Sequence, residues 1–355
     1  MTYADESELE FDDGEPWATG GNAEIFAVRW RRRRYYYKRY LPELRAVVAV
    51  AALERMITWR IELPGAEQQR LDGCCAWPRI IVRAGDGLRG ILVPPAPDTF
   101  MTRPGDRRKA RSLSGLRLLE ANVAEHEVDA HVPEVLAALG HTVQVIRWLH
   151  GHDVIVNDVQ PENVLVDEGA TRIFLVDCDS MVSRHWGGAV APPTAPEYIN
   201  GVVTGDPSPS VDLAKLAWCT FLLLLRDFAP RGVDDWVAGA MRRYLTGSTV
   251  TLLTEAIGNR VSEPRWDTFW SERAGHWITL GRSGVLVTDA GMRQVTTVVP
   301  RQRAEVRTEP RAEPYLGRAE TPVPPGLNWT RVASYAIPVL IVIVVLIFIC
   351  NGGDA

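Results

Sequence analysis

The chain has 355 residues, of which 46% are hydrophobic and 23% are charged, so it can bury one large core or two smaller ones. The formal net charge of −5 excludes a globally basic surface of the kind that binds nucleic acid. Five cysteines lack the spacing of a disulfide framework or a zinc site, which favours a reducing compartment.

The first fifteen residues carry seven acidic side chains and no basic one. Such a run is typical of a solvated segment, so we expect residues 1–15 to form a disordered acidic tail. The run also lacks the basic start and the apolar stretch of a secretory signal peptide.

The next part of the chain is predicted to be rich in β-structure. Strands are expected over residues 21–30 and 35–40, on either side of a run of arginines. A hairpin is expected over residues 78–85 and 88–97, where it ends in prolines. Residues 45–59 have the composition and apolar spacing of a helix, and an insertion separates them from the hairpin.

Beyond the hairpin the pattern becomes helical. Two helices are expected within residues 112–151, and a long buried helix over residues 210–228. Residues 276–299 alternate like a small β-rich extension. We therefore expect an α+β fold over about residues 16–275, in which a small β-rich lobe is followed by a larger helical lobe from about residue 98.

The C-terminal part has a different composition. Residues 300–331 are rich in Pro, Arg and Glu and are predicted to be a disordered linker. Residues 332–350 are an uncharged run of 19, nearly long enough for a straight helix to cross a bilayer. Arginines precede this run, whereas residues 351–355 contain none. We expect a single-pass cell-membrane protein that contacts lipid through this helix, with its N-terminal part cytoplasmic and its short tail outside.

Two neighbouring stretches carry residues suited to a metal ion and a phosphate. VNDVQPENVLVD (156–167) places Asn163 five residues after Asp158, and FLVDCDS (174–180) ends an apolar strand in Asp177. Carboxylate and amide oxygens are ligands that Mg²⁺ prefers, and phosphoryl transfer depends on positioning and charge neutralisation. The alternative is a turn that an Asp and an Asn stabilise.

Lys38 stands out because the chain has 39 basic residues and only three of them are lysines. A position that keeps Lys against this bias is expected to need a compact ammonium group rather than a planar guanidinium group. The alternative is a single lysine that lies on a surface strand by chance.

The order of these elements and motifs resembles that of the protein-kinase superfamily, and more closely its divergent bacterial branch, over about residues 16–270. The resemblance implies a two-lobed fold that binds ATP with Mg²⁺ (or Mn²⁺). It implies that Asp158 accepts or orients the proton of the attacking hydroxyl. It also implies that Asn163 and Asp177 hold magnesium and that Lys38 contacts the phosphates.

Other positions of the kinase pattern are matched less fully. Gly20 and Gly21 stand where a glycine-rich loop would cover the phosphates, although a third glycine is missing. Val93, at the end of the predicted hairpin, would contact the nucleotide. The resemblance implies a helix glutamate as the ion-pair partner of the strand lysine, with Glu54 as the first choice and Glu62 as the alternative.

Two elements that resemble structural parts of protein kinases follow. Ala195-Pro196-Glu197 resembles the end of an activation segment, and Glu197 would pair with Arg260 or Arg265. Asp212 begins a hydrophobic helix and resembles the buried aspartate that braces the catalytic loop. A buried carboxylate needs partners, and backbone amides of the catalytic loop would supply them.

The chain also departs from the kinase pattern. Val156-Asn157 replace the usual His-Arg, Gln160 replaces a lysine near the γ-phosphate, and Cys178-Asp179 replace Phe-Gly. The loss of the arginine makes control by activation-loop phosphorylation doubtful. The loss of the lysine removes a positive charge that assists transfer.

Three functions stay open. The first is an ATP-dependent Ser/Thr protein kinase that acts on protein substrates at the membrane. The second is a catalytically weak or dead pseudokinase that binds nucleotide and recruits signalling partners. The third is a small-molecule phosphotransferase. We favour the first because the four residues most needed for Mg·ATP are all present: Lys38, Asp158, Asn163 and Asp177.

Overall fold

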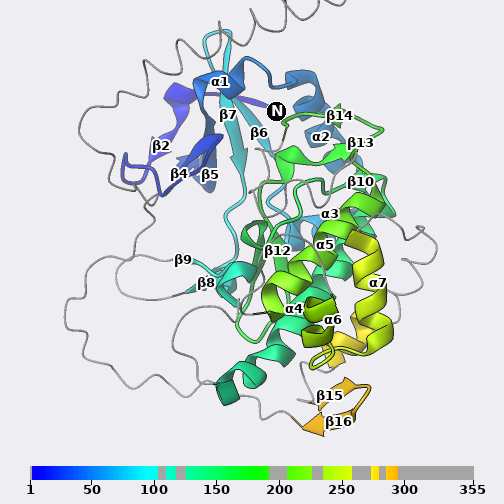
Figure 1. The fold of residues 1–355 in the computed structure, drawn as a ribbon. Coiled ribbons are helices and arrows are strands. Elements are labelled where there is room, and N and C mark those ends of the chain that lie inside the picture. Colours follow the sequence, from blue (N-terminus) through cyan, green and yellow to red (C-terminus); the bar gives the residue numbers. More distant parts are fainter. Residues whose placement is uncertain are drawn as a thin grey trace, which may run out of the picture. The chain divides into compact units, whose positions relative to one another are not determined.

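The computed structural model describes residues 2–102, 109–116, 125–191, 206–225, 235–257, 273–279 and 285–294 (Figure 1). The chain divides into two units, Met1–Val299 and Pro300–Ala355, and every described residue belongs to the first. The predicted linker, membrane span and tail therefore lie outside the described residues. Within the described ranges, no helix combines the length and the apolar character needed to cross a membrane.

A seven-stranded sheet forms the N-terminal region, in the order β1-β6-β7-β5-β4-β2 with β3 beside β4. The strands are β1 (Tyr3–Asp5), β2 (Glu10–Phe11), β3 (Ala18–Thr19), β4 (Ala23–Trp30), β5 (Arg33–Tyr40), β6 (Ile80–Ala84) and β7 (Gly87–Val93). β1 runs parallel to β6, whereas β4, β5, β7 and β6 are antiparallel neighbours. The two predicted strands and the predicted hairpin are confirmed as β4, β5 and the β6–β7 pair.

The predicted disordered tail over residues 1–15 is wrong. β1, the turn η1 (Glu6–Glu8) and β2 lie within it, and β1 extends the edge of the sheet. The side chains of Ala4 and Leu9 are buried, and Glu6 accepts a hydrogen bond of 2.7 Å from the Tyr37 hydroxyl. Composition alone suggested disorder because the partners of these acidic side chains lie far along the chain.

Three helices connect β5 to β6. They are α1 (Pro42–Arg45), α2 (Val50–Glu62) and α3 (Gly65–Cys74). The helix predicted over residues 45–59 begins later, as α2, because α1 ends at Arg45 and residues 46–49 form a non-helical connection. α3 is the predicted insertion. Buried residues Leu53 and Met56 attach α2 to the main core.

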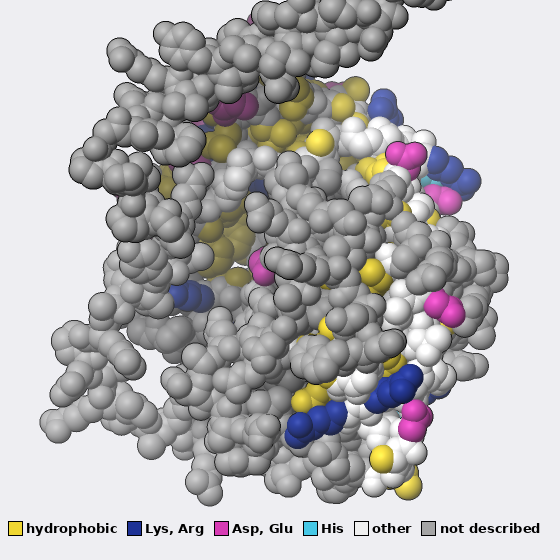
Figure 2. All heavy atoms as spheres, in the orientation of Figure 1, with side chains coloured by type: hydrophobic (Ala, Val, Ile, Leu, Met, Phe, Trp, Pro, Cys, Tyr) yellow, Lys and Arg dark blue, Asp and Glu magenta, His cyan; other side chains and the backbone are white. Residues whose placement is uncertain are grey.

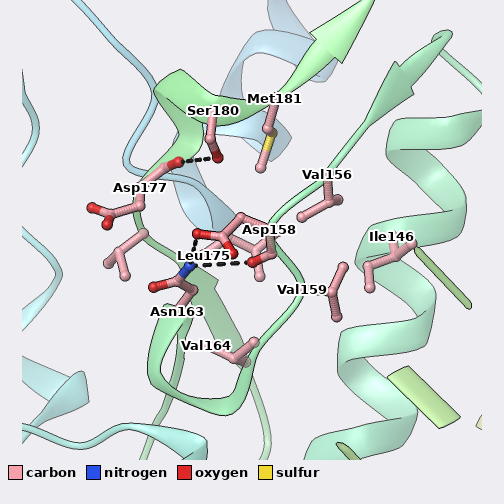
Figure 3. A pocket seen from close by; sticks show the side chains of 11 residues that line it. Ile146, Val156, Asp158, Val159, Asn163, Val164, Leu175, Asp177, Ser180 and Met181 are labelled. Atoms are coloured by element: carbon pink, nitrogen blue, oxygen red, sulfur yellow. Dashed lines mark hydrogen bonds between the residues drawn. The ribbon is translucent and has the colours of Figure 1, made fainter. Parts of the chain in front are cut away.

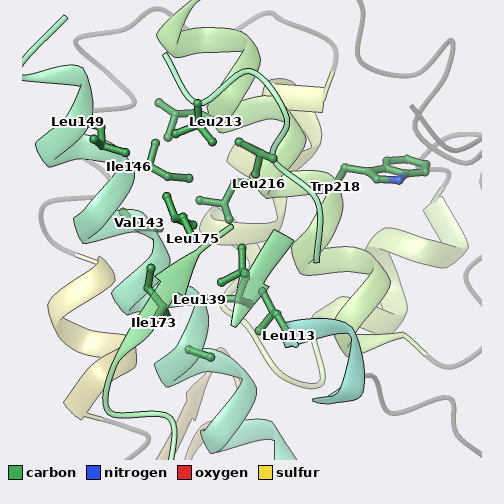
Figure 4. Close-up of a cluster of buried hydrophobic side chains, with 14 of the residues drawn as sticks. Leu113, Leu139, Val143, Ile146, Leu149, Ile173, Leu175, Leu213, Leu216 and Trp218 are labelled. Carbon is green, nitrogen blue, oxygen red and sulfur yellow. The ribbon is translucent and has the colours of Figure 1, made fainter. Parts of the chain in front are cut away.

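A helical region follows the sheet. Its helices are α4 (Glu125–His150), α5 (Pro209–Leu224), α6 (Asp235–Met241), α7 (Gly247–Ile257) and a further helix over residues 273–279. α5 is the predicted buried helix, and Ser208 caps it by accepting a hydrogen bond of 3.3 Å from the Val211 amide. Figure 4 shows side chains of α4, such as Val143 and Ile146, meeting Leu213 and Leu216 of α5.

Short strands and turns near α4 and α5 carry the motif residues. β10 (Val154–Ile155) pairs with β13 (Val182–Ser183), which also pairs with β14 (Gly187–Gly188). β11 (Val164–Val166) and β12 (Ile173–Leu175) form a hairpin. The single turns η4 (Pro161–Asn163) and η5 (Cys178–Ser180) stand beside that hairpin.

Two details of the predicted helical region change. Residues 112–151 contain the short turn η3 (Leu113–Leu116) and one long helix, α4, while residues 117–124 lie outside the described part. Residues 276–279 are helical, and the described β-structure of the predicted β-rich extension is the hairpin β15 (Val285–Thr288) and β16 (Gly291–Gln294). The remaining described elements are η2 (Asp98–Phe100), β8 (Met101–Thr102) and β9 (Lys109–Ala110). The mixed α+β class itself is confirmed.

Candidate functional site

The β11–β12 hairpin positions the three motif residues of the helical region. Asp158 lies in the loop before η4, Asn163 ends η4, and Asp177 follows β12 (Figure 3). The Asn163 amide nitrogen donates hydrogen bonds to Asp158 Oδ2 at 2.8 Å and to the Asp158 carbonyl at 3.2 Å. The Val176 amide donates to the Asn163 carbonyl at 2.9 Å and so ties the third residue to the other two. The sequence prediction that these residues form one site is supported by their proximity.

Asp177 adopts the left-handed backbone conformation, with φ 56° and ψ 35°. That conformation is unfavourable for a residue with a Cβ atom, by roughly 1–2 kcal/mol. The side chain is 45% exposed, and its Oδ1 lies 3.2 Å from Lys38 Nζ. Asp177 thus presents a partly open carboxylate beside an ammonium group.

Lys38 reaches this site from β5 of the sheet. Its side chain is only 10% exposed, and its Nζ donates a hydrogen bond of 2.8 Å to Asp179 Oδ1. Burial alone would lower the pKa of Lys38, but the Asp179 and Asp177 carboxylates outweigh this and raise it. The side chain is therefore a permanently charged ammonium group inside the protein.

Asp179 is a site residue that the sequence reasoning missed. It is 1% exposed, and its second oxygen, Oδ2, accepts a hydrogen bond of 2.8 Å from the Tyr40 hydroxyl. The sequence was interpreted as having lost a glycine at this position. The aspartate itself could have indicated a buried ion pair, because a charge inside an apolar segment needs a buried partner.

The predicted pairing of Glu54 with Lys38 is wrong. Across the described ranges, the ion-pair partners of Lys38 are Asp177 and Asp179. Glu54 instead accepts a hydrogen bond from the Tyr3 hydroxyl, which in turn accepts one of 2.7 Å from Arg83. The N-terminal strand that the prediction overlooked thus occupies Glu54, and the alternative, Glu62, is an exposed residue at the end of α2.

The predicted contacts of Asp212 are present. Its side chain is fully buried, and its oxygens accept hydrogen bonds from the backbone amides of Val156 at 2.7 Å and Asn157 at 2.8 Å. Lys215, one turn further along α5, donates a hydrogen bond to the Asn157 carbonyl. α5 therefore holds the loop before Asp158 with a carboxylate and an ammonium group, and Asn157 has a positive φ of 66° there.

The environment of Asp158 changes its acidity. Burial is the largest influence, and it raises the pKa of Asp158 above its usual range. The hydrogen bond from Asn163 and the ammonium groups of Lys215 and Lys38 oppose this rise, whereas the charge of Asp177 adds to it. A carboxylate with a raised pKa is a stronger proton acceptor than a solvent-exposed one.

A cavity of about 290 Å³ opens next to these residues. Lys38, Asp177 and Asp179 line one part of it, and its apolar lining includes Val93 and Phe174. A much smaller hollow that Asp158 and Asn163 line shares Val176 and Asp177 with the cavity. Figure 2 shows hydrophobic side chains set back in a hollow on this face of the molecule. The cavity can take a ligand with an apolar body and a charged end.

On the sheet side of the cavity, the expected glycine-rich loop does not line the cavity. Gly20 and Gly21 form the turn between β3 and β4, but they are not among the residues that line the cavity. Neither glycine has a positive φ, so no conformation there requires glycine. Instead, Trp17 and Tyr36 line the cavity with stacked rings, 5.3 Å apart and inclined by 11°.

The available donors suit a divalent cation whose remaining ligands come from elsewhere. The Asn163 side-chain nitrogen bonds to Asp158, and Figure 3 shows the side-chain oxygen of Asn163 turned away from that bond, on the same side as the Asp177 carboxylate. Within the part of the chain that the structure describes, no group of three or more His, Cys, Asp and Glu side chains is placed to hold a metal alone. Water and ligand oxygens would have to complete a Mg²⁺ site here.

Glu197 and its expected partners, Arg260 and Arg265, lie outside the described residues. A comparison of the chain with protein-family models and with curated proteins finds no match.

Proposed function

We propose that the chain is a divergent protein kinase with a two-lobed fold, which transfers the γ-phosphate of ATP to Ser or Thr of proteins. The observation that carries this proposal is the convergence of Lys38, Asp158, Asn163 and Asp177 beside one cavity. A turn that merely uses Asp and Asn as caps needs neither a buried ammonium group from another element nor an adjoining cavity.

Each residue has a task that its surroundings support. Lys38 would contact phosphate oxygens, and the side-chain oxygens of Asn163 and Asp177 would hold Mg²⁺ or Mn²⁺. The bound cation would neutralise phosphate charge. Asp158 would orient a substrate hydroxyl and accept its proton, which its raised pKa favours.

The local charge balance also favours a cation. Asp158, Asp177 and Asp179 are three carboxylates, and the nearby ammonium groups are those of Lys38 and Lys215. This excess of negative charge would repel a free triphosphate, but a divalent ion would reverse its sign. Magnesium-dependent nucleotide binding follows from this balance.

The membrane assignment is part of the proposal. We propose that residues 332–350 anchor the protein in the cell membrane with its N-terminal unit in the cytoplasm. The uncharged run and the arginines before it support this orientation. Protein substrates or signalling partners would then be met at the membrane surface.

The second candidate is a pseudokinase scaffold that binds nucleotide without efficient transfer. Gln160 favours it, because this neutral side chain replaces a lysine and donates a hydrogen bond of 3.2 Å to Asp158 Oδ2. The third candidate, a small-molecule phosphotransferase, is less favoured. The braced loop at Asp212 resembles protein kinases more than small-molecule kinases.

The test is transfer of labelled γ-phosphate from ATP by the full chain in detergent, with Mg²⁺ or Mn²⁺, to itself and to a generic protein acceptor. The matched control is Asp158→Asn. Label that disappears in the control supports a kinase. Nucleotide binding without any transfer supports the scaffold, and absence of nucleotide binding in a folded protein contradicts both.

A further inference from the structure

We infer that Asp179 is the positioning residue that anchors Lys38 for nucleotide binding, in place of a glutamate from helix α2. The inference rests on the proposed function, because the position of Lys38 matters only if its ammonium group meets a ligand. Asp179 does not contact that ligand in this scheme. It acts through Lys38.

Asp179 and Lys38 are buried together and satisfy each other's charge. Asp179 is 1% exposed, with one oxygen bonded to Lys38 Nζ at 2.8 Å and the other to the Tyr40 hydroxyl at 2.8 Å. Lys38 and Tyr40 are two residues apart on β5 and therefore point to the same face of the sheet. A buried carboxylate that lost such partners would be strongly destabilising, so this pair holds one geometry.

Asp177 contacts the same ammonium group in a different way. This carboxylate is 45% exposed, and its oxygen lies further from Lys38 Nζ, at 3.2 Å. Asp179 fixes the ammonium group from inside the protein, while Asp177 keeps a carboxylate available at the cavity. A segment of three residues thus supplies both the anchor and the expected cation ligand.

Hydrogen bonds attach residues 177–180 to the loop that carries Asp158. The Ser180 hydroxyl donates a hydrogen bond of 2.8 Å to the Asp177 carbonyl. The side-chain amide nitrogen of Asn157 donates one of 3.1 Å to the Ser180 carbonyl. Asn157 directly precedes Asp158. Lys38, Asp177 and Asp158 are therefore connected through short contacts that involve residues 177–180.

Helix α2 has partners other than Lys38. Glu54 accepts its hydrogen bond from Tyr3 of β1. Arg55 donates a hydrogen bond of 3.1 Å to the Trp186 carbonyl, and the Ala49 amide donates one of 3.0 Å to the Ala189 carbonyl. α2 is thus attached to the sheet edge and to the segment after β13. The position of Lys38 should not depend on Glu54.

The first experiment observes Lys38 directly in the full chain. The chain contains only three lysines, so selective ¹³C and ¹⁵N labelling of lysine gives three side-chain signals. The variants are Asp179→Asn and, as the matched control, Glu54→Gln. We expect Asp179→Asn to shift the side-chain signal of Lys38, because the carboxylate that holds its ammonium group at 2.8 Å is removed. We expect Glu54→Gln to leave the Lys38 signal unchanged.

The second experiment measures the affinity for Mg·ATP in the same variants. We expect Asp179→Asn to weaken binding by about tenfold or more, and Glu54→Gln to change it by less than about twofold. Restoring the carboxylate as Asp179→Glu should recover part of the affinity, which loss of folding alone would not allow.

The outcomes separate the inference from the proposed function. If the natural chain binds Mg·ATP, and Glu54→Gln weakens binding or moves the Lys38 signal as much as Asp179→Asn does, the inference is overturned. If Asp179→Asn fails to fold, the Glu54→Gln result still decides, since an effect of that variant contradicts the inference. If the natural chain binds no nucleotide, the proposed function fails. The role of Asp179 in nucleotide binding then fails with it. The lysine signals still report which carboxylate holds Lys38.

Discussion

The contacts on the two sides of the cavity, the helical region and the sheet that carries Lys38, were predictable from the sequence to different degrees. On the helical side, Asp158 and Asn163 are five residues apart and bond to each other, and Asp212 receives the expected backbone amides. On the sheet side, the partner of Lys38 is Asp179, and the helix glutamate Glu54 faces Tyr3. Spacing along the chain determines contacts within a short hairpin. It does not determine which of several distant carboxylates a strand residue will meet.

The difference also has a physical cause. β1 adds a strand at the edge of the sheet and brings the Tyr3 hydroxyl to Glu54, so that carboxylate is already satisfied. Lys38 is buried and needs a counter-charge, which Asp179 provides. If this account is correct, changes on the helical side should abolish chemistry, and changes around Glu54 should affect only stability.

The largest expected effect is on the helical side, at Asp158. We expect Asp158→Asn to reduce phosphate transfer by about 10³-fold, because the proton acceptor is lost. In the natural chain, transfer should fall as the pH falls through the pKa of Asp158, which burial places above the usual range for an aspartate. The measurement is the transfer rate against pH at constant ionic strength.

A stability measurement sharpens this prediction. A raised pKa means that burial penalises the charged carboxylate, so the Asp158 charge opposes folding above its folded-state pKa. Asp158→Asn should therefore unfold at a temperature equal to or above that of the natural chain. A variant that lost activity through unfolding would instead melt lower.

The next effect concerns the hydrogen bonds of Asp212 to the loop before Asp158. Asp212→Ala leaves two buried backbone amides without an acceptor, which should destabilise the chain by about 2–4 kcal/mol. The matched control is Asp206→Ala, since Asp206 is exposed and should change stability by less than about 0.5 kcal/mol. Denaturant unfolding measures both. Equal stability of the two variants would mean that α5 does not brace the loop.

Two glycine substitutions test the backbone next to Lys38. A Cβ atom at Gly90 of β7 would lie 2.0 Å from the Lys38 carbonyl oxygen, so Gly90→Ala must displace one of the two strands. We expect a loss of about 1–3 kcal/mol, together with weaker nucleotide binding. Gly73, on α3, has no atom within 4 Å of such a Cβ, and Gly73→Ala should stabilise the chain by about 0.5–1 kcal/mol. If Gly90→Ala left stability unchanged, the pairing of β5 with β7 beside Lys38 would be able to adjust to the added methyl group.

Much of the fold followed from the sequence. Strand-like composition on either side of a run of arginines located β4 and β5, and the long apolar run located α5. The N-terminal strand was missed because its acidic residues suggested a solvated segment, although Ala4 and Leu9 are buried. Asp179 was missed because a departure from a motif was interpreted as a loss. Both errors concern charges whose partners lie on remote elements, and no local pattern records such pairs.

The smallest expected effect tests the separation of the two sides. Tyr3→Phe removes the hydrogen bonds to Glu54 and from Arg83, which should cost about 1 kcal/mol of stability. Nucleotide affinity should not change, because Asp179 holds Lys38 without help from α2. Tyr35→Phe, on β5 of the same sheet, is the control for removing a tyrosine hydroxyl. If Tyr3→Phe weakened Mg·ATP binding, a signal at the N-terminal strand would reach Lys38 through α2, and the two sides of the cavity would be coupled.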